Sequence, residues 1–203
     1  MPDAQDIAAD PSGTNTLVIT LPFPEEGFLA VREKNPPPLF SDDLETGAAG
    51  WTTIINDAFG NTEWELGTPT GTTGPLAGAG ESVNAWCTGL GDYGVESDIS
   101  LRTPAIDLSG VASALLSFDA YRDADGFGDT ATIRFLRSSD QSQLGEDVPI
   151  DMTIFDVDYD AIEVLVPAAA IGESVLIEFN FVSDGTLDTF SGLCLDNILV
   201  QVP

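Results

Sequence analysis

The sequence predicts an all-β protein built as a β-sandwich, and three observations lead to that prediction. The chain has 203 residues and 43% hydrophobic residues, which is enough for one sandwich domain with a substantial core and a short appendage. Its 20 glycines and 13 prolines are spread along the chain rather than gathered in a repeat. Short apolar runs alternate with turn-forming clusters, and no convincing helical pattern appears.

Residues 1–38 are expected to form an N-terminal extension that carries one or two strands. Two runs favour strands, Asn15–Thr20 and Gly27–Arg32, and the Pro-punctuated segment Leu21–Glu26 separates them. The run Lys34–Pro38 (KNPPP) is typical of a stiff linker. We therefore expect a boundary there and a main domain that spans residues 39–203.

The main domain is expected to consist of short strands joined by turns such as Gly71–Gly80 and Asp123–Asp129. Ala168–Ile171 is at most one helical turn. The expected strands are Trp51–Ile55, Glu63–Gly67, Val83–Cys87, Ala114–Tyr121, Ala131–Arg137, Ala161–Val166, Ser174–Val182 and Leu193–Val202.

Three of these strands show a period of two, which assigns side chains to faces. The clearest core face carries Val175, Ile177, Phe179 and Phe181. In the last strand the same spacing puts Asp196 on one apolar face with Cys194, Ile198, Val200 and Val202. In Ala114–Tyr121 it puts Asp119 with Leu115 and Tyr121.

The charge excludes some partners. With 34 acidic and 6 basic residues, the net charge is −28, whereas nucleic-acid binding needs clustered cations. An anionic membrane surface is disfavoured for the same reason, and no run of about 20 apolar residues is present to insert into a membrane. A calcium ion or a basic partner fits the sign. Solubility in a salty medium is the alternative explanation for the bulk of the charge.

The residue inventory argues against catalysis. The chain contains no histidine, which excludes Ser-His-Asp, Cys-His and His-ligated zinc sites. Phosphate-binding and Gly-x-Ser-x-Gly motifs are missing. Two carboxylates can hydrolyse a glycoside, but no pair stands out among so many. We therefore expect a non-catalytic protein.

The two cysteines, Cys87 and Cys194, are predicted to form a disulfide. Both lie in strand-like runs, and chain entropy predicts a gain of roughly 4–5 kcal/mol from closing so long a loop. Two buried unpaired thiols are the alternative. The start of the chain does not resemble a signal peptide, so we interpret it as a mature domain of a longer exported protein, located outside the cell or on its surface.

A carboxylate on an apolar strand face points to a bound cation. Such a group is costly to bury without a partner, and basic side chains are scarce here. Calcium takes six to eight oxygen ligands, so we predict a calcium site. Its candidate ligands are Asp196, Glu45 with its neighbour Asp43, and Asp119. The alternative is that Asp196 accepts hydrogen bonds from backbone amides at the edge of the sandwich.

Two further sites are predicted with weaker patterns. Asp123, Asp125 and Asp129 form an acidic run that begins like half of a calcium loop but lacks its final glutamate. This run is a candidate second metal site, and the alternative is a solvated turn. Trp64 lies among polar residues and is a candidate platform for stacking on a sugar ligand. The alternative is that Trp51, Trp64 and Trp86 all anchor the core.

Several phrases resemble the MAM-like jelly rolls, which include the choice-of-anchor and cleaved-adhesin modules of bacterial secreted proteins. The resemblance covers about residues 39–202. It is carried by Phe40–Trp51 (FSDDLETGAAGW), Trp64–Pro69 (WELGTP), Trp86–Leu90 (WCTGL), Leu101–Gly110 (LRTPAIDLSG), Leu115–Tyr121 (LLSFDAY) and Leu195–Val200 (LDNILV), which follow in the family's order.

The resemblance implies a fold and a calcium site. The fold is a two-sheet antiparallel β-sandwich of jelly-roll type, with the extension of residues 1–38 as its appendage. The family's first glutamate and the aspartate of its last strand match Glu45 and Asp196, and Asp119 is a less certain match. Cys87 and Cys194 depart from the family's pattern, so the disulfide has no family support.

These observations lead to one expected function and two alternatives. The first is a non-catalytic, calcium-stabilised extracellular accessory module for adhesion or substrate targeting. The alternatives are a carbohydrate-binding module, and a structural or assembly domain of a surface protein. A glycan or a surface protein is the expected partner besides calcium, and the sequence leaves its identity and the oligomeric state open.

Overall fold

The computed structural model describes residues 36–187 and 189–203, and residues 36–203 form one compact unit. The two strands expected at Asn15–Thr20 and Gly27–Arg32 lie outside the described residues. The described part contains strands and no helix. Its strands are β1 (Phe40–Asp42), β2 (Thr52–Ile55), β3 (Glu65–Gly67), β4 (Ala85–Cys87), β5 (Asp98–Arg102), β6 (Ile106–Asp107), β7 (Leu115–Asp123), β8 (Thr130–Arg137), β9 (Val148–Ile150), β10 (Asp160–Leu165), β11 (Ser174–Val182) and β12 (Gly192–Gln201).

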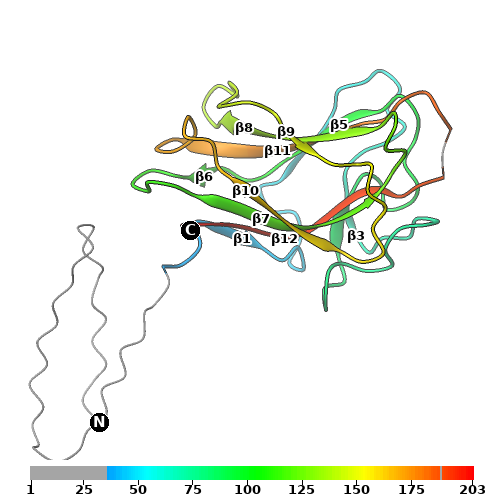
Figure 1. Ribbon diagram of the computed structural model, residues 1–203, viewed down its shortest axis with the longest axis horizontal. Helices are drawn as coiled ribbons and strands as arrows, with labels where there is room; N and C mark the ends of the chain where they lie inside the picture. The colour runs from blue at the N-terminus through cyan, green and yellow to red at the C-terminus, as the bar shows by residue number, and fades with distance from the viewer. Residues whose placement is uncertain (1–35, 188) are drawn as a thin grey trace, which may run out of the picture. The chain divides into compact units, whose positions relative to one another are not determined.

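The strands form two antiparallel sheets that pack face to face, which confirms the predicted sandwich (Figure 1). One sheet has the order β10-β7-β12-β4-β3, and β1 also pairs with β12. The other has the order β2-β5-β11-β8-β9, and β6 also pairs with β11. Strand β12 is therefore the centre of the first sheet, because it pairs with β7 on one side and with both β4 and β1 on the other.

The alternation in β11 produces the core as predicted. Val175, Ile177, Phe179 and Phe181 are all at most 1% exposed and belong to one hydrophobic cluster. Across the sandwich, the ring of Phe179 meets that of Phe118 on β7 edge to face, with ring centroids 5.2 Å apart. Such aromatic pairs add about 0.5–1.5 kcal/mol to the effect of burial alone. The two sheets are thus joined by interdigitating apolar side chains.

All eight expected strands are present with small shifts of their ends, and β1, β5, β6 and β9 were not predicted. Strand β5 alternates only two apolar residues, Ile99 and Leu101, with polar ones, so its signal is short although it pairs with β2 and β11. Strands β1, β6 and β9 have two or three residues, too few to show a period. These four strands were not predicted because they are too short to show a hydrophobic period.

The predicted face of Asp196 is wrong, because β12 contains a bulge. The register between β12 and β7 shifts between Asp196 and Leu199, and Asn197 has a positive φ of 49°. Ile198 and Val200 therefore face the core between the sheets, whereas Asp196 and Cys194 point to the outer face of the sheet. Asp196 is nevertheless fully buried, so something other than the second sheet covers it.

Candidate functional site

A loop of residues 77–84, called here the cover loop, lies over Asp196. It leads into β4, which pairs with β12 through Cys194↔Cys87 and Leu195↔Trp86. One further step in this antiparallel register brings the start of β4 opposite Asp196. The backbone N–H of Ala79 donates to Asp196 Oδ2 at 2.8 Å, and that of Asn197 donates to Oδ1 at 2.7 Å. Asp196 thus fastens the cover loop onto the sheet.

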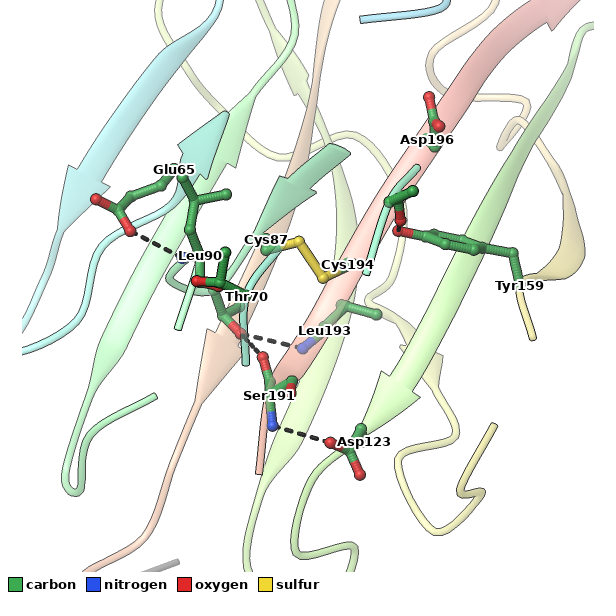
Figure 2. Close-up of a disulfide and its surroundings, with 12 residues drawn as sticks. Glu65, Thr70, Cys87, Leu90, Asp123, Tyr159, Ser191, Leu193, Cys194 and Asp196 are labelled. Atoms are coloured by element: carbon green, nitrogen blue, oxygen red, sulfur yellow. Dashed lines mark hydrogen bonds between the residues drawn. A yellow bond between two sulfur atoms is a disulfide. The ribbon is translucent and has the colours of Figure 1, made fainter. Parts of the chain in front are cut away.

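The predicted disulfide between Cys87 and Cys194 is present and is central to this arrangement (Figure 2). It joins β4 to β12 two residues before Asp196, and Figure 2 shows Tyr159 extending toward the same part of β12. The hydroxyl of Tyr159 donates to the carbonyl oxygen of Ala77 at 3.1 Å. Tyr159 also packs on the small cluster around the disulfide, which includes Tyr121. The cover loop is therefore held at both of its ends.

Glu45, which is distant in the sequence and follows β1, reaches the same loop. Its Oε1 accepts hydrogen bonds from Ser82 Oγ at 2.8 Å and from the backbone N–H groups of Val83 and Asn84 at 3.0 and 2.7 Å. Two residues therefore bind one loop, one after the first strand and the other in the last. The structure thus brings Glu45 and Asp196 to the same loop.

The turn that presents Glu45 is fixed by its own side chains. Asp42 Oδ1 accepts from the N–H of Leu44 at 2.9 Å, and Asp42 Oδ2 accepts from the indole N–H of Trp51 at 2.8 Å. Leu44 is fully buried and has a φ of 61°, an uncommon conformation for a branched side chain. Its burial offsets the backbone strain, and the turn then projects Glu45 toward the cover loop.

Several oxygens gather around Ser82. Its hydroxyl lies 2.8 Å from Glu45 Oε1, 3.3 Å from the carbonyl oxygen of Asn84 and 3.5 Å from that of Asp43. A side chain on Gly78 would collide with both the Asn84 carbonyl oxygen and Asp196 Oδ2, so these two oxygens flank the same spot. The oxygens of two carboxylates, two carbonyls and one hydroxyl therefore line the underside of the cover loop.

The two carboxylates differ in their electrostatics. Burial raises the pKa of Asp196, and the N–H groups of Ala79 and Asn197 and the hydroxyl of Ser82 oppose that effect. Hydrogen bonds from Asn84 and Ser82 lower the pKa of Glu45. In the part of the chain that the structure describes, neither carboxylate takes part in a salt bridge. Among the described residues, amide and hydroxyl donors stabilise the pair.

Asp119 lies beside this site but is turned to another partner. It faces Asp196 directly across the β7–β12 ladder, and its negative charge adds to the rise in the pKa of Asp196. Its Oδ2 accepts a hydrogen bond from the side chain of Asn197 at 2.8 Å. Asp43 is also turned away, because its Oδ1 accepts from the N–H of Glu45 at 3.3 Å. Its carbonyl oxygen, rather than its carboxylate, faces the cover loop.

Among residues 36–187 and 189–203, no three acidic or cysteine side chains gather closely enough to hold a metal on their own. A cation here would therefore rely on Glu45, Asp196 and neutral oxygens. That donor set suits calcium, which accepts carboxylate, carbonyl and hydroxyl oxygens in flexible geometry. Calcium binding at this site stays a prediction.

The second predicted metal run spans the end of β7 and the loop that leads to β8, and its carboxylates bind partners from different segments. Asp123 Oδ2 accepts from the N–H of Ser191 at 2.9 Å and from Thr73 Oγ1 at 2.6 Å. Asp129 instead accepts from the hydroxyl of Tyr93 and, at 2.9 Å, from the N–H of Asp184. Burial raises the pKa of Asp129. These carboxylates fix the ends of neighbouring loops.

Asp125, the middle member of that run, caps its own turn. Its Oδ1 accepts from the N–H of Phe127 at 3.1 Å, the geometry of an Asx turn. Its carbonyl oxygen accepts from the N–H of Asp129 at 2.8 Å. A structural role thus accounts for the pattern that resembled half of a calcium loop.

The interpretation of Trp64 as a sugar-stacking platform is wrong. Trp64 is only 2% exposed, and Trp51 and Trp86 are also buried. Trp51 and Trp86 pack on each other with ring centroids 5.9 Å apart. Trp64 lies just before β3, where its neighbours Glu63 and Glu65 are exposed and half-buried, so its polar sequence context does not reflect its own burial. All three tryptophans belong to the core.

Sequence reasoning missed the residues of the cover loop, above all Ser82 and Asn84. A signal for them exists, because pairing Cys87 with Cys194 brings the residues before Cys87 over those after Cys194. The run Ala77–Asn84 (AGAGESVN) is also rich in small residues, as a loop packed closely on a sheet requires. The bulge at Asn197 carries no comparable signal in a single sequence.

Comparisons with known proteins support the fold. Neither a family model nor a curated protein matches the sequence. Among solved structures, the K1 cleaved adhesin domain of Lys-gingipain from Porphyromonas gingivalis W83 is similar, with a TM-score of 0.55 and 20% identity over 81% of this chain and 98% of that one. The K3 cleaved adhesin domain of the same protein gives a TM-score of 0.54 and 18% identity, covering 81% and 99%.

A third similar structure is the enzymatically active domain of tailspike protein 4 from bacteriophage CBA120. It gives a TM-score of 0.52 and 15% identity over 77% of this chain and 20% of that chain. At these identities the likeness concerns the fold alone. It agrees with the cleaved-adhesin part of the resemblance seen in the sequence, whereas the MAM-like label finds no such support.

No helix long and apolar enough to cross a membrane occurs in the described ranges.

Proposed function

We propose that this domain is a non-catalytic, calcium-stabilised extracellular accessory module that serves adhesion or substrate targeting. The observation that carries the proposal is the convergence of Glu45 and Asp196 on the cover loop. Glu45, just after the first strand, and Asp196, in the last strand, bind one loop, and the carbonyl oxygens of Asp43 and Asn84 lie near Ser82 of that loop. A calcium ion at this point would tie both ends of the domain together.

The disulfide supports an extracellular location. Cys87 and Cys194 are bonded and buried, and disulfides of this structural kind persist in oxidising compartments. The adhesin-like fold is compatible with adhesion, although fold alone does not fix a ligand. A glycan remains a candidate ligand, but buried Trp64 cannot serve as its platform. The alternative of a structural or assembly domain of a surface protein stays a prediction.

The calcium part of the proposal predicts a melting temperature that depends on calcium. A ligand at about 100 times its dissociation constant stabilises the native state by about 2.7 kcal/mol. For a domain of this size, that corresponds to a rise of roughly 5–11 °C. The measurement is thermal unfolding of the full chain in excess calcium and in excess chelator.

Two variants locate the effect. Asp196→Asn should abolish most of the rise, because it removes one of the two charges at the cover loop. Asp140→Asn removes an equal charge from an exposed turn, where Asp140 accepts from Ser142, and should retain the full rise. Equal melting temperatures of the unaltered chain in calcium and in chelator would contradict the proposal, as would an undiminished rise in the Asp196→Asn variant.

A further inference from the structure

Three loops at one end of the sandwich expose large apolar side chains to solvent. They follow β7, β9 and β11, and Figure 1 shows them at the same end of the two sheets. Phe127, Val157 and Leu187 are 101%, 98% and 86% exposed, and Ile154 and Phe155 are 39% and 55% exposed. We call these five residues the loop-end patch.

The three loops contact one another, so the patch has a defined base. The ring of Phe155 packs on Phe190, with centroids 5.5 Å apart, which joins the loop after β9 to the loop after β11. Gly126 lies so close to the backbone of Thr153 that a side chain there would collide with it. The N–H of Asp184 donates to Asp129 at 2.9 Å, which connects the loop after β11 to the loop after β7.

The fold does not account for the exposure of these side chains. A single exposed apolar residue is ordinary on a protein surface. Several on adjoining loop tips form the kind of patch that marks an interaction surface. Val157 and Leu187 leave almost their whole surface in water, so they contribute little to the core. Their clustering at one end is the feature to be explained.

The surroundings of the patch are strongly acidic. The loop residues 124–129, 151–159 and 183–191 contain no lysine or arginine. Aspartates such as Asp125, Asp151 and Asp158 lie in the same loops as the apolar side chains. The nearby Arg122 is buried and held by Asp156 and Asp160 at 2.8 Å each, so its charge is compensated. The loops that carry the patch are therefore negatively charged.

The negative charge of these loops distinguishes between the candidate partners of the loop-end patch. A second copy of the chain would bring the same acidic loops against these, and an anionic membrane would also be repelled. A protein with an apolar centre surrounded by lysine and arginine complements both features. Its cations would speed association, and its apolar side chains would hold the complex together.

We propose that the loop-end patch is the docking surface for a protein partner that presents apolar side chains within a ring of cations. This deepens the adhesion role proposed above and rests on it in one respect, that the domain acts by binding. It does not require the calcium ion.

The test uses two short amphipathic peptides as probes, one of leucine and lysine and one with glutamate in place of lysine. Binding to the full chain is measured by fluorescence anisotropy. A triple variant carries Phe127→Ser, Val157→Ser and Leu187→Ser. A control variant carries Leu165→Ser and Val202→Ser, two exposed apolar residues beside the start of β7, at the opposite end of that strand from the patch.

We expect the lysine peptide to bind the unaltered chain and the control variant equally well. The glutamate peptide should not bind. The triple variant should bind the lysine peptide roughly tenfold more weakly or worse. Equal binding to the triple variant would show attraction by charge alone and would overturn the proposal. A lack of binding of the lysine peptide to the unaltered chain would also overturn it. So would binding of the unaltered chain to vesicles of neutral lipid that the triple variant loses, because the patch would then bind a lipid surface.

Performing the measurement in calcium and in chelator separates the two proposals. If peptide binding fails while the calcium-dependent melting shift is present, the loop-end patch is wrong and the calcium site stands. If the shift is absent while patch-dependent binding is present, only the calcium claim fails.

Discussion

Removing the disulfide should cost a large and calculable part of the stability. Cys87 and Cys194 are separated by 107 positions, so the bridge closes most of the domain into one loop. The chain-entropy relation gives about 4.8 kcal/mol at 25 °C for a loop of that length. For a domain of this size, the melting temperature should fall by roughly 10–19 °C.

The assay is urea unfolding of the Cys87→Ala, Cys194→Ala and double variants, followed by the fluorescence of the buried tryptophans. Either single substitution removes the same bridge, so each single variant and the double variant should lose similar amounts. The slope of the free energy of unfolding against urea should also rise, because the unbridged unfolded chain exposes more surface.

Two results would refute this reasoning. A loss below about 1 kcal/mol would mean that the bridge does not constrain the unfolded chain as the loop length requires. A double variant that loses the sum of the two single losses would mean that packing of the separate side chains, rather than the bridge, supplies the stability.

Two further predictions concern other parts of the fold. Gly74→Ala should destabilise the domain by about 1–3 kcal/mol, because the new Cβ would collide with the buried side chain of Ser191. Adding Ser191→Gly should recover part of that loss, and a double variant as unstable as the sum would contradict the contact. Asp57→Asn should flatten the acid limb of stability against pH. The N–H of Asp98, followed by that of Gly60, lowers the pKa of Asp57, so its contribution is present above the unfolded value of 3.8 and lost as the pH falls through the folded value. Equal acid slopes in the unaltered chain and the variant, measured by denaturant unfolding across pH, would contradict this assignment.

The architecture could be predicted from the sequence because its signals are local. Strand β11 shows a clean period of two over nine residues, and it lies where that period placed it. The site was harder to predict, because it depends on register. Asp196 was correctly expected to be buried, yet the bulge at Asn197 turns it to the outer face, where the cover loop buries it.

Polar contacts that cross the fold were the least predictable. Asp119 and Asp43 have the same chemistry as Glu45, but Asn197 and the local turn occupy their carboxylates. Trp64 was misread because its polar neighbours Glu63 and Glu65 are more exposed than Trp64 itself. A carboxylate's partner is set by which loop packs on it, and a single sequence does not specify that packing.

The central claim is that an ion joins Glu45 and Asp196, and anomalous scattering from crystals grown in calcium tests it most directly. The account predicts a peak between Glu45, Asp196 and the carbonyl oxygen of Asn84, with calcium–oxygen distances of about 2.3–2.6 Å. A map without that peak, in which Ser82 still donates to Glu45 and Ala79 still donates to Asp196, would contradict it.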